Sequence, residues 1–196
     1  PPHKPPQGLL PFSLRLELLA VAFSGIDSIR INPMEGERPG PSYTVDTLAW
    51  YQAEGTRPLF VMGVTDFLTL PEWHEGERIP ELADLALIPR LGQSWNATKT
   101  FINDHWSPSG KWHGRLATEP VTRTDRRGLE YWSLGRPSTG EAVSRIYYAP
   151  MPRLDLSASL IREKWRQGGS LRGLTPRAVE EVISAQGQDV QEAWGK

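Results

Sequence analysis

The feature that most limits how this chain can fold is a pair of short, almost continuous apolar runs. They lie at residues 58–64 (Pro-Leu-Phe-Val-Met-Gly-Val) and 84–90 (Asp-Leu-Ala-Leu-Ile-Pro-Arg), with a short helical pattern near 79–83 between them. Runs without polar alternation are typical of strands buried on both faces, as in a parallel sheet covered by helices. The pattern therefore predicts an α/β fold.

Hydrophobic periodicity and the placing of glycine and proline predict the remaining elements. Helices are expected over residues 13–24, 42–54, 67–70, 157–167 and 176–186, strands over 28–33 and 144–150, and a loop over 34–41. Thr175 is expected to cap the last helix and Gly187 to end it. The helical period is lost from 91 to 139, where four of the eight tryptophans lie, so residues 1–196 are expected to form one domain with an irregular, Trp-rich insertion at about 93–140.

Composition excludes several classes of function. The 196 residues include 22 Lys plus Arg and 23 Asp plus Glu, a net charge of −1 that gives no broad attraction to nucleic acid or membrane. No cysteine is present, which excludes a disulfide framework, a thiolate nucleophile and Cys-ligated zinc. No apolar run approaches the ~20 residues that span a bilayer. The four histidines show no metal-ligand pairing at i, i+4, so no protein-held metal is expected.

The most informative candidate site is the segment 155–162 (Asp-Leu-Ser-Ala-Ser-Leu-Ile-Arg), which lies where a helix is expected to begin. The hydroxyls of Ser157 and Ser159, the Arg162 guanidinium and the free N–H groups of the helix start would together suit a phosphate. In the plainer alternative, a serine only caps the helix and Arg162 is solvated. The residues taken alone favour that alternative.

A second candidate lies at the carboxyl end of the first apolar run, where ligands bind in open α/β sheets. Gly63 would let a ligand approach the backbone closely, and Asp66 could bind a ribose or cap the helix that follows. Trp73 could stack on a planar ligand, although packing is the commoner use of such a residue. His74 beside it could titrate or donate a hydrogen bond.

Six segments of the chain carry more information in their order than any one of them does alone. They are Pro-Pro-His-Lys at 1–4, Pro-Ser-Tyr-Thr-Val-Asp-Thr-Leu at 41–48, Gly-Val-Thr-Asp at 63–66, Leu-Pro-Glu-Trp at 70–73, Leu-Ile-Pro-Arg at 87–90 and Leu-Ser-Ala-Ser-Leu-Ile-Arg at 156–162. Together they resemble bacterial nicotinate mononucleotide adenylyltransferase. The resemblance implies a Rossmann-like, doubly wound sheet and transfer of the adenylyl group of ATP, carried with Mg²⁺, to nicotinate mononucleotide in cytoplasmic NAD biosynthesis.

The resemblance also implies a role for each candidate residue, and the roles position substrates and neutralise charge without a nucleophile. Three residues would act in catalysis at the phosphates: His3, Lys4 and Arg162. Five would contact ATP: Gly63, Asp66, Ser157, Ser159 and Arg162. Four would bind nicotinate mononucleotide: Thr44, Trp73, His74 and Arg90. Among these, Thr44 would donate its backbone N–H to the carboxylate and Trp73 would stack on the pyridine ring.

The sequence departs from the family in two places. His74 stands where the family often has tyrosine, which changes the pocket wall. The family also opens with Gly-x-Phe-Asp-Pro-x-His-x-Gly-His, and this sequence contains no match. In the strand order 3-2-1-4-5-6, residues 28–33 would be the third strand and 58–64 the fourth. We therefore expect the functional protein to carry this signature before Pro1, and the present residues to show no appreciable turnover and an exposed apolar edge at Leu59.

Two other functions stay open. A related nucleotidyltransferase could act on another phosphate acceptor, although Thr44 and Trp73 match the pyridine pocket and argue against it. A non-catalytic nucleotide-binding or interaction module could use the Trp-rich insertion as a partner surface. The expected partners are ATP and nicotinate mononucleotide, and the residues leave open homo-oligomer formation and the choice between acid and amide substrates.

Overall fold

The computed structural model describes residues 8–89, 95–112, 114–117, 122–151 and 156–195. The chain divides into two compact units, the first made of Pro1–Ser42 with Asp155–Lys196 and the second of Tyr43–Leu154. The expectation of one domain with an insertion stays a prediction. Within the described ranges, no helix combines the length and the apolar character needed to cross a membrane.

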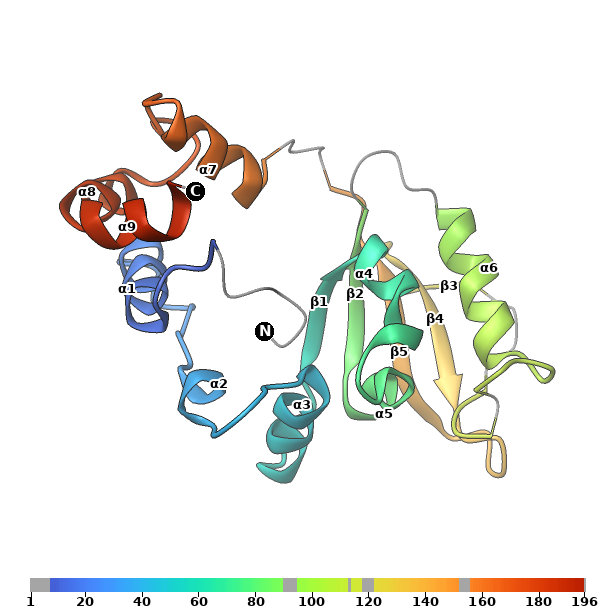
Figure 1. Ribbon diagram of the computed structural model, residues 1–196. Coiled ribbons are helices and arrows are strands. Elements are labelled where there is room, and N and C mark those ends of the chain that lie inside the picture. The colour runs from blue at the N-terminus through green and yellow to red at the C-terminus, as the bar shows by residue number, and fades with distance from the viewer. Residues whose placement is uncertain (1–7, 90–94, 113, 118–121, 152–155, 196) are drawn as a thin grey trace. The chain divides into compact units, whose positions relative to one another are not determined.

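The second unit is built on a mixed five-stranded sheet (Figure 1). In spatial order its strands are β1 (Leu59–Gly63), β2 (Asp84–Ile88), β5 (Ala142–Tyr148), β4 (Glu130–Gly135) and β3 (Arg123–Thr124). β1, β2 and β5 run parallel, whereas β4 and β3 are antiparallel to their neighbours. The parallel core confirms the expected α/β class, and the β4 and β3 strands depart from a wholly parallel sheet. Gly63 pairs with Ile88, so the carboxyl ends of β1 and β2 lie together.

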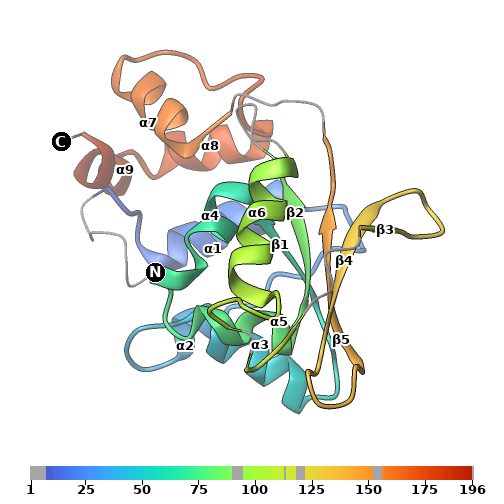
Figure 2. The ribbon, with the colours of Figure 1, turned by 90° about the vertical axis from the view of Figure 1, so that its right-hand side faces the viewer.

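Helices cover one face of this sheet. They are α3 (Thr44–Ala53), α4 (Val64–Leu68), η1 (Leu70–Glu72), η2 (Gly76–Arg78), α5 (Ile79–Leu82) and α6 (Trp95–Trp106). α4 and α5 lie in front of the strands in Figure 1, where α6 lies to the right of them, and α6 lies to the left of β4 and β5 in Figure 2. The core beneath them includes these fully buried side chains: Phe67, Leu70, Ile79, Leu85, Leu87, Ile102, Trp106 and Ile146.

The expectation that residues 58–64 form a strand buried on both faces is wrong. In β1, Met62 is buried, but Leu59 and Val61 are 55% and 59% exposed. Because side chains alternate along a strand, Leu59 and Val61 share the face opposite the core. β1 also lies at the end of the strand order among the described residues, as expected for an apolar edge at Leu59.

The segment 93–140 is not irregular throughout, contrary to the expectation. It contains α6, β3 and β4. The buried side of α6 carries two polar residues, Thr98 and His105, beside its apolar ones, so the apolar spacing that would reveal the helix is interrupted. In β4 the buried Trp132 donates its indole N–H to Thr122 Oγ1 at 2.8 Å.

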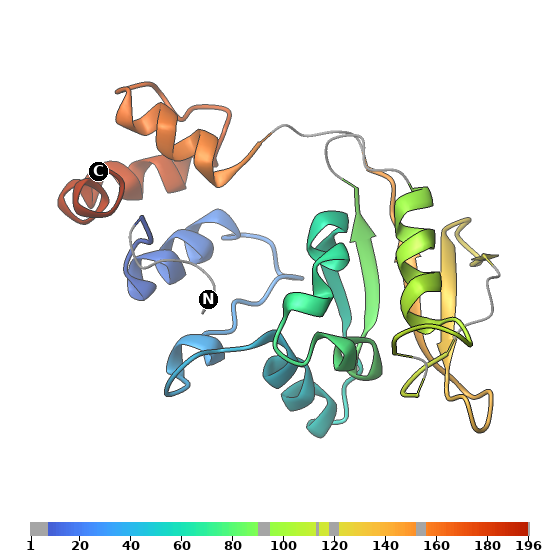
Figure 3. The same cartoon turned by 45° about the vertical axis from the view of Figure 1, so that its right-hand side comes forward.

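The first unit is helical in its described part. Its helices are α1 (Phe12–Ala22), α2 (Met34–Glu37, a single turn within the segment expected to be a loop), α7 (Ala158–Arg166), α8 (Arg177–Ala185) and α9 (Gly187–Trp194). Figure 3 shows α7, α8 and α9 close to one another. They share with α1 a second core made of Leu10, Leu14, Leu171, Val179, Ile183, Val190 and Trp194.

Three local expectations are wrong in this unit. Residues 28–33 form no strand. The Ile29 N–H donates to the Ile26 carbonyl at 3.0 Å in a turn, and not to the backbone of a neighbouring strand. The strand order that counted this segment third therefore fails. Thr175 does not cap α8, since its hydroxyl oxygen is buried without a hydrogen-bond partner among the described residues. Gly187 does not end the helical region, because its φ is not positive and it begins α9.

Candidate functional site

The loop after β1 places Gly63 and Asp66 at the carboxyl end of the sheet. Gly63 ends β1 and precedes α4, so the helix expected over 67–70 begins earlier, at Val64. A Cβ at position 63 would lie 2.9 Å from Asp66 Oδ2, the far end of an exposed side chain that could turn away, so the geometry does not by itself require glycine here. Asp66 is exposed and makes no side-chain cap, and its charge near the start of α4 is favourable to the helix dipole.

Trp73 follows the single turn η1 in the same loop. Its side chain is half-buried and packs against the core of the second unit. The backbone N–H of Trp73 donates to the Leu70 carbonyl at 3.0 Å, and its indole N–H donates to Thr69 Oγ1 at 3.3 Å. The indole is thus both packed and held by its polar edge, and part of its surface stays accessible.

His74 stacks on Tyr43, with ring centroids 4.1 Å apart and planes inclined by 29°. Tyr43 is the residue before α3, and its carbonyl accepts the N–H groups of Asp46 and Thr47. Thr44 is the first residue of α3, where backbone N–H groups have no partner within the helix. The stack therefore brings three of the expected substrate residues, Thr44, Trp73 and His74, to one place at the start of α3.

The sequence motifs assign no role to Tyr43 or Thr69, although the position of each residue in the sequence indicates that it lies near the candidate site. Tyr43 lies inside the matched segment 41–48, next to Thr44. Thr69 lies four residues before Trp73, the spacing at which side chains meet across a helical turn. What was missing is the tertiary contact between the start of α3 and the loop after α4.

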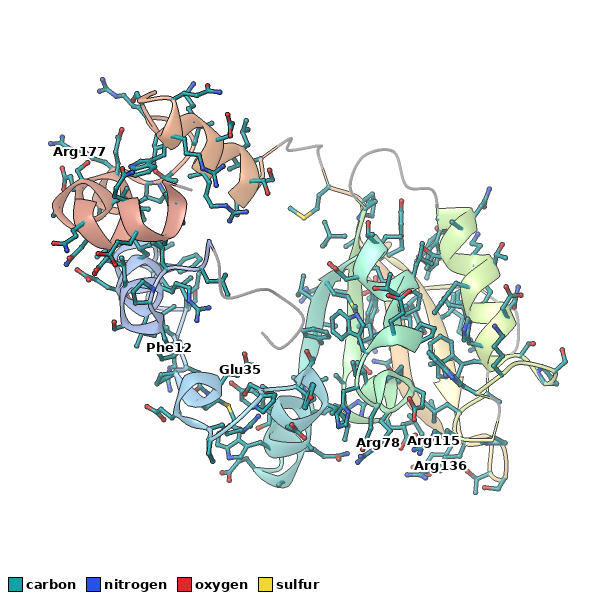
Figure 4. All side chains as sticks on the ribbon, viewed as in Figure 1. Phe12, Glu35, Arg78, Arg115, Arg136 and Arg177 are labelled. Atoms are coloured by element: carbon teal, nitrogen blue, oxygen red, sulfur yellow. The ribbon has the colours of Figure 1, made fainter. Side chains whose placement is uncertain are left out.

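A charged cluster borders this loop. Glu75 adopts a left-handed conformation, with φ of 48°, and its carboxylate pairs with the Arg78 guanidinium. The hydrogen bond from Arg78 lowers the pKa of the Glu75 carboxyl below its ordinary value, and the charges of His74 and Arg115 lower it further. Arg115 pairs with Glu81 at 3.1 Å. The Arg78 and Arg115 side chains are labelled in Figure 4.

The start of α7 carries the second group of candidates, and this group belongs to the first unit. Ser157 is the N-cap residue, and its hydroxyl oxygen accepts the Leu160 N–H at 3.1 Å. Arg162 donates from Nη2 to Ser159 Oγ at 3.1 Å, one turn along the helix. Both serines are exposed. Ser157 thus caps the helix, as in the plainer alternative, and this role leaves its hydroxyl proton available to another acceptor.

Three residues with an expected role lie outside the described residues: His3, Lys4 and Arg90. Their roles stay predictions. In the described part of the chain, no group of three or more His, Asp or Glu residues is placed to hold a metal ion.

Comparison of the sequence with known proteins identifies the family to which the chain belongs. Comparison with models of protein families gives no match. Among individual relatives, "Probable nicotinate-nucleotide adenylyltransferase" of Geobacter metallireducens is 31% identical over 191 residues, covering 95% of this chain and 78% of that protein. The protein of the same name from Sodalis glossinidius is 32% identical over 191 residues, with the same coverage. That from Thermomicrobium roseum is 30% identical over 189 residues, covering 95% of this chain and 72% of that protein. Together with the α/β sheet, these similarities show that the chain belongs to the nicotinate-nucleotide adenylyltransferase family.

Proposed function

We propose that this protein transfers the adenylyl group of ATP to nicotinate mononucleotide, giving nicotinate adenine dinucleotide and pyrophosphate. The observation that carries the proposal is the grouping of Trp73 and the Tyr43–His74 stack at the start of α3. Family membership supports the nucleotidyltransferase class, and the relatives' names support the pyridine nucleotide as acceptor.

In the proposed complex, the pyridine ring of nicotinate mononucleotide stacks on the accessible face of Trp73. Its carboxylate accepts the backbone N–H of Thr44, at the positive end of the α3 dipole. His74 closes the side of this site through its contact with Tyr43. Arg90, expected to bind the same substrate, stays part of the proposal as a prediction.

ATP enters the proposal as its magnesium complex. Ser157, Ser159 and Arg162 would hold its phosphates at the start of α7, where the backbone N–H groups and the helix dipole also favour an anion. Gly63 and Asp66 would contact the nucleoside part. His3 and Lys4 would also contact the phosphates.

The reaction needs positioning and charge neutralisation more than a covalent catalyst. A phosphate oxygen of nicotinate mononucleotide forms a bond to the α-phosphorus of ATP, and the bond from that phosphorus to the bridging oxygen breaks. Pyrophosphate leaves with the electron pair of the broken bond. Arg162 would stabilise the charge that develops on the phosphates.

Substitution of Trp73 by alanine tests the substrate site. By analogy with base stacking on aromatic residues, Trp73→Ala should weaken nicotinate mononucleotide binding by about 1–3 kcal/mol in a calorimetric titration. Trp50→Ala is the matched control, because Trp50 is a 42% exposed tryptophan of α3 with no place in the proposed site. Equal affinities of Trp73→Ala and the unsubstituted protein would assign Trp73 to packing alone.

Pyrophosphate release from ATP and nicotinate mononucleotide tests turnover. Because the family's opening signature is not among the present residues, binding of both ligands without release would favour the non-catalytic nucleotide-binding module over the enzyme only when it is observed in a protein that carries this signature. Parallel titration with nicotinamide mononucleotide measures the preference between acid and amide. Cytoplasmic location and homo-oligomer formation stay predictions.

A further inference from the structure

The indole of Trp73 is connected to the backbone of α4 through a single hydroxyl. Trp73 Nε1 donates to Thr69 Oγ1 at 3.3 Å, and the same hydroxyl donates to the Asp66 carbonyl oxygen at 3.0 Å. A threonine hydroxyl has one proton to donate and two lone pairs that accept, so both hydrogen bonds form at once. Two hydrogen bonds in series therefore link the indole edge to the last turn of α4.

The backbone around this link is fixed at both ends. Thr69 ends α4 and begins η1, and Trp73 ends η1 with its N–H bonded to the Leu70 carbonyl at 3.0 Å. Pro71 within η1 has its φ fixed by its ring. The remaining freedom of Trp73 lies in its two side-chain torsions, and the hydrogen bond to Thr69 restricts both of them.

We infer that Thr69 is a positioning residue, which holds the Trp73 indole in the orientation that stacks on the pyridine ring of the substrate. The inference rests on the proposed function for the identity of the ligand, and on the hydrogen bonds for the role of Thr69. A stacking platform loses affinity when its ring must be immobilised on binding, because the ordering cost then falls on the complex. Thr69 removes that cost before the ligand arrives.

If the Thr69 hydroxyl only stabilised the fold, its removal would lower the affinity for ligand equally with and without the Trp73 indole. The Asp66 carbonyl also accepts the backbone N–H of Thr69 at 3.2 Å, so it stays paired when the hydroxyl is removed. Thr69→Val keeps the shape of the side chain and deletes both hydroxyl bonds, whereas Thr69→Ser keeps the hydroxyl. Thr100→Val, at an exposed threonine of α6, is the control for the exchange itself.

The first readout needs no ligand. The chain has eight tryptophans, and the indole N–H of Trp73 is identified in an ¹⁵N spectrum as the signal that Trp73→Phe removes. Thr69→Val should shift this signal and speed its exchange with solvent, whereas Thr69→Ser and Thr100→Val should leave it in place. An unchanged Trp73 signal in Thr69→Val would overturn the inference.

The second readout is affinity for nicotinate mononucleotide. Loss of one neutral hydrogen bond that orders a side chain should raise the dissociation constant by about 3- to 10-fold in Thr69→Val. Thr69→Ser should restore the affinity. In the Trp73→Phe background, where no indole N–H exists, Thr69→Val should have no further effect.

The outcomes separate this inference from the proposed function. An equal loss of affinity with and without the Trp73 indole would show that Thr69 acts through the fold, and would overturn the positioning role alone. Absence of nicotinate mononucleotide binding by the unsubstituted chain would overturn the proposed function, and with it the identity of the ligand that Trp73 is positioned for.

Discussion

Ser157→Asp separates the two roles that Ser157 can have, as helix cap and as phosphate ligand. The Ser157 hydroxyl oxygen accepts the Leu160 N–H at 3.1 Å, and aspartate is as good an N-cap as serine. The substitution should therefore leave the stability of the first unit unchanged, whereas Ser157→Ala should reduce it by about 1 kcal/mol. In contrast, the new carboxylate would face the phosphates of ATP.

The size of the effect on binding follows from Coulomb's law. A phosphate that contacts the hydroxyls of Ser157 and Ser159 would carry its charge about 5 Å from the new carboxylate. With an effective dielectric constant between about 20 and 80, the repulsion is roughly 1–3 kcal/mol, or about 5- to 150-fold in the dissociation constant of MgATP. Added salt should reduce this difference, because the site is exposed.

The assay pairs chemical denaturation with calorimetric titration of MgATP. Ser109→Asp adds the same charge at an exposed serine outside the proposed site and serves as the control. A Ser157→Asp protein that is as stable as the unsubstituted chain and binds MgATP equally well would refute the phosphate site at α7, and Ser157 would then be a helix cap only.

Three further predictions concern stability, each measured by denaturant-induced unfolding. Gly76→Ala should destabilise by about 1–3 kcal/mol, because a Cβ there would lie 2.0 Å from the Leu70 carbonyl oxygen and the loop would have to move; an unchanged midpoint would contradict this. Glu75 has a folded pKa below its ordinary value of 4.5 because Arg78 bonds to it, so its contribution is present above that value and is lost as pH falls through the folded pKa. As the pH falls below 4.5, the free energy of unfolding should therefore decrease less in Glu75→Gln than in the unsubstituted chain. If the two free energies decrease equally with pH, the result would count against the ion pair. Thr98→Val should stabilise by about 1 kcal/mol, since the Thr98 hydroxyl is buried without a partner among the described residues, and a loss of stability would reveal a hydrogen bond there.

The sequence predicted the elements whose pattern is local. Continuous apolar runs gave β1 and β2, and their parallel pairing followed from the helical segment between them. The helices at 42–54 and 157–167 were predicted from period 3.6, and the structure has them as α3 and α7. These predictions hold because the helical period and the continuous apolar run are patterns of residues close together in the chain.

Local pattern failed where partners far along the chain decide the outcome. Residues 28–33 alternate as a strand does, but no described strand pairs with them. A turn ends at Ser28, and residues 29–33 have no regular secondary structure. α6 was hidden because Thr98 and His105 occupy its buried side, where His105 bonds to the Phe101 carbonyl at 2.8 Å and stacks on its ring. His105 can be buried because a specific partner satisfies it, whereas the Thr98 hydroxyl is buried without a partner among the described residues, and no periodicity contains either fact.

The candidate site divides in the same way. Its residue types, and the likeness that gave them roles, were evident from the sequence, because Thr44, Trp73 and Ser157 lie in short motifs beside predicted element ends. The stack of His74 on Tyr43 and the bond from Trp73 to Thr69 were decided by the tertiary structure. The stack brings the start of α3 against the loop after α4, and the bond depends on how the turn of η1 aims the indole. The sequence by itself thus determined which chemical groups of this protein can contact a nucleotide. The fold determined which of these groups have a fixed orientation, because side-chain orientation depends on tertiary contacts that the order of residues does not specify.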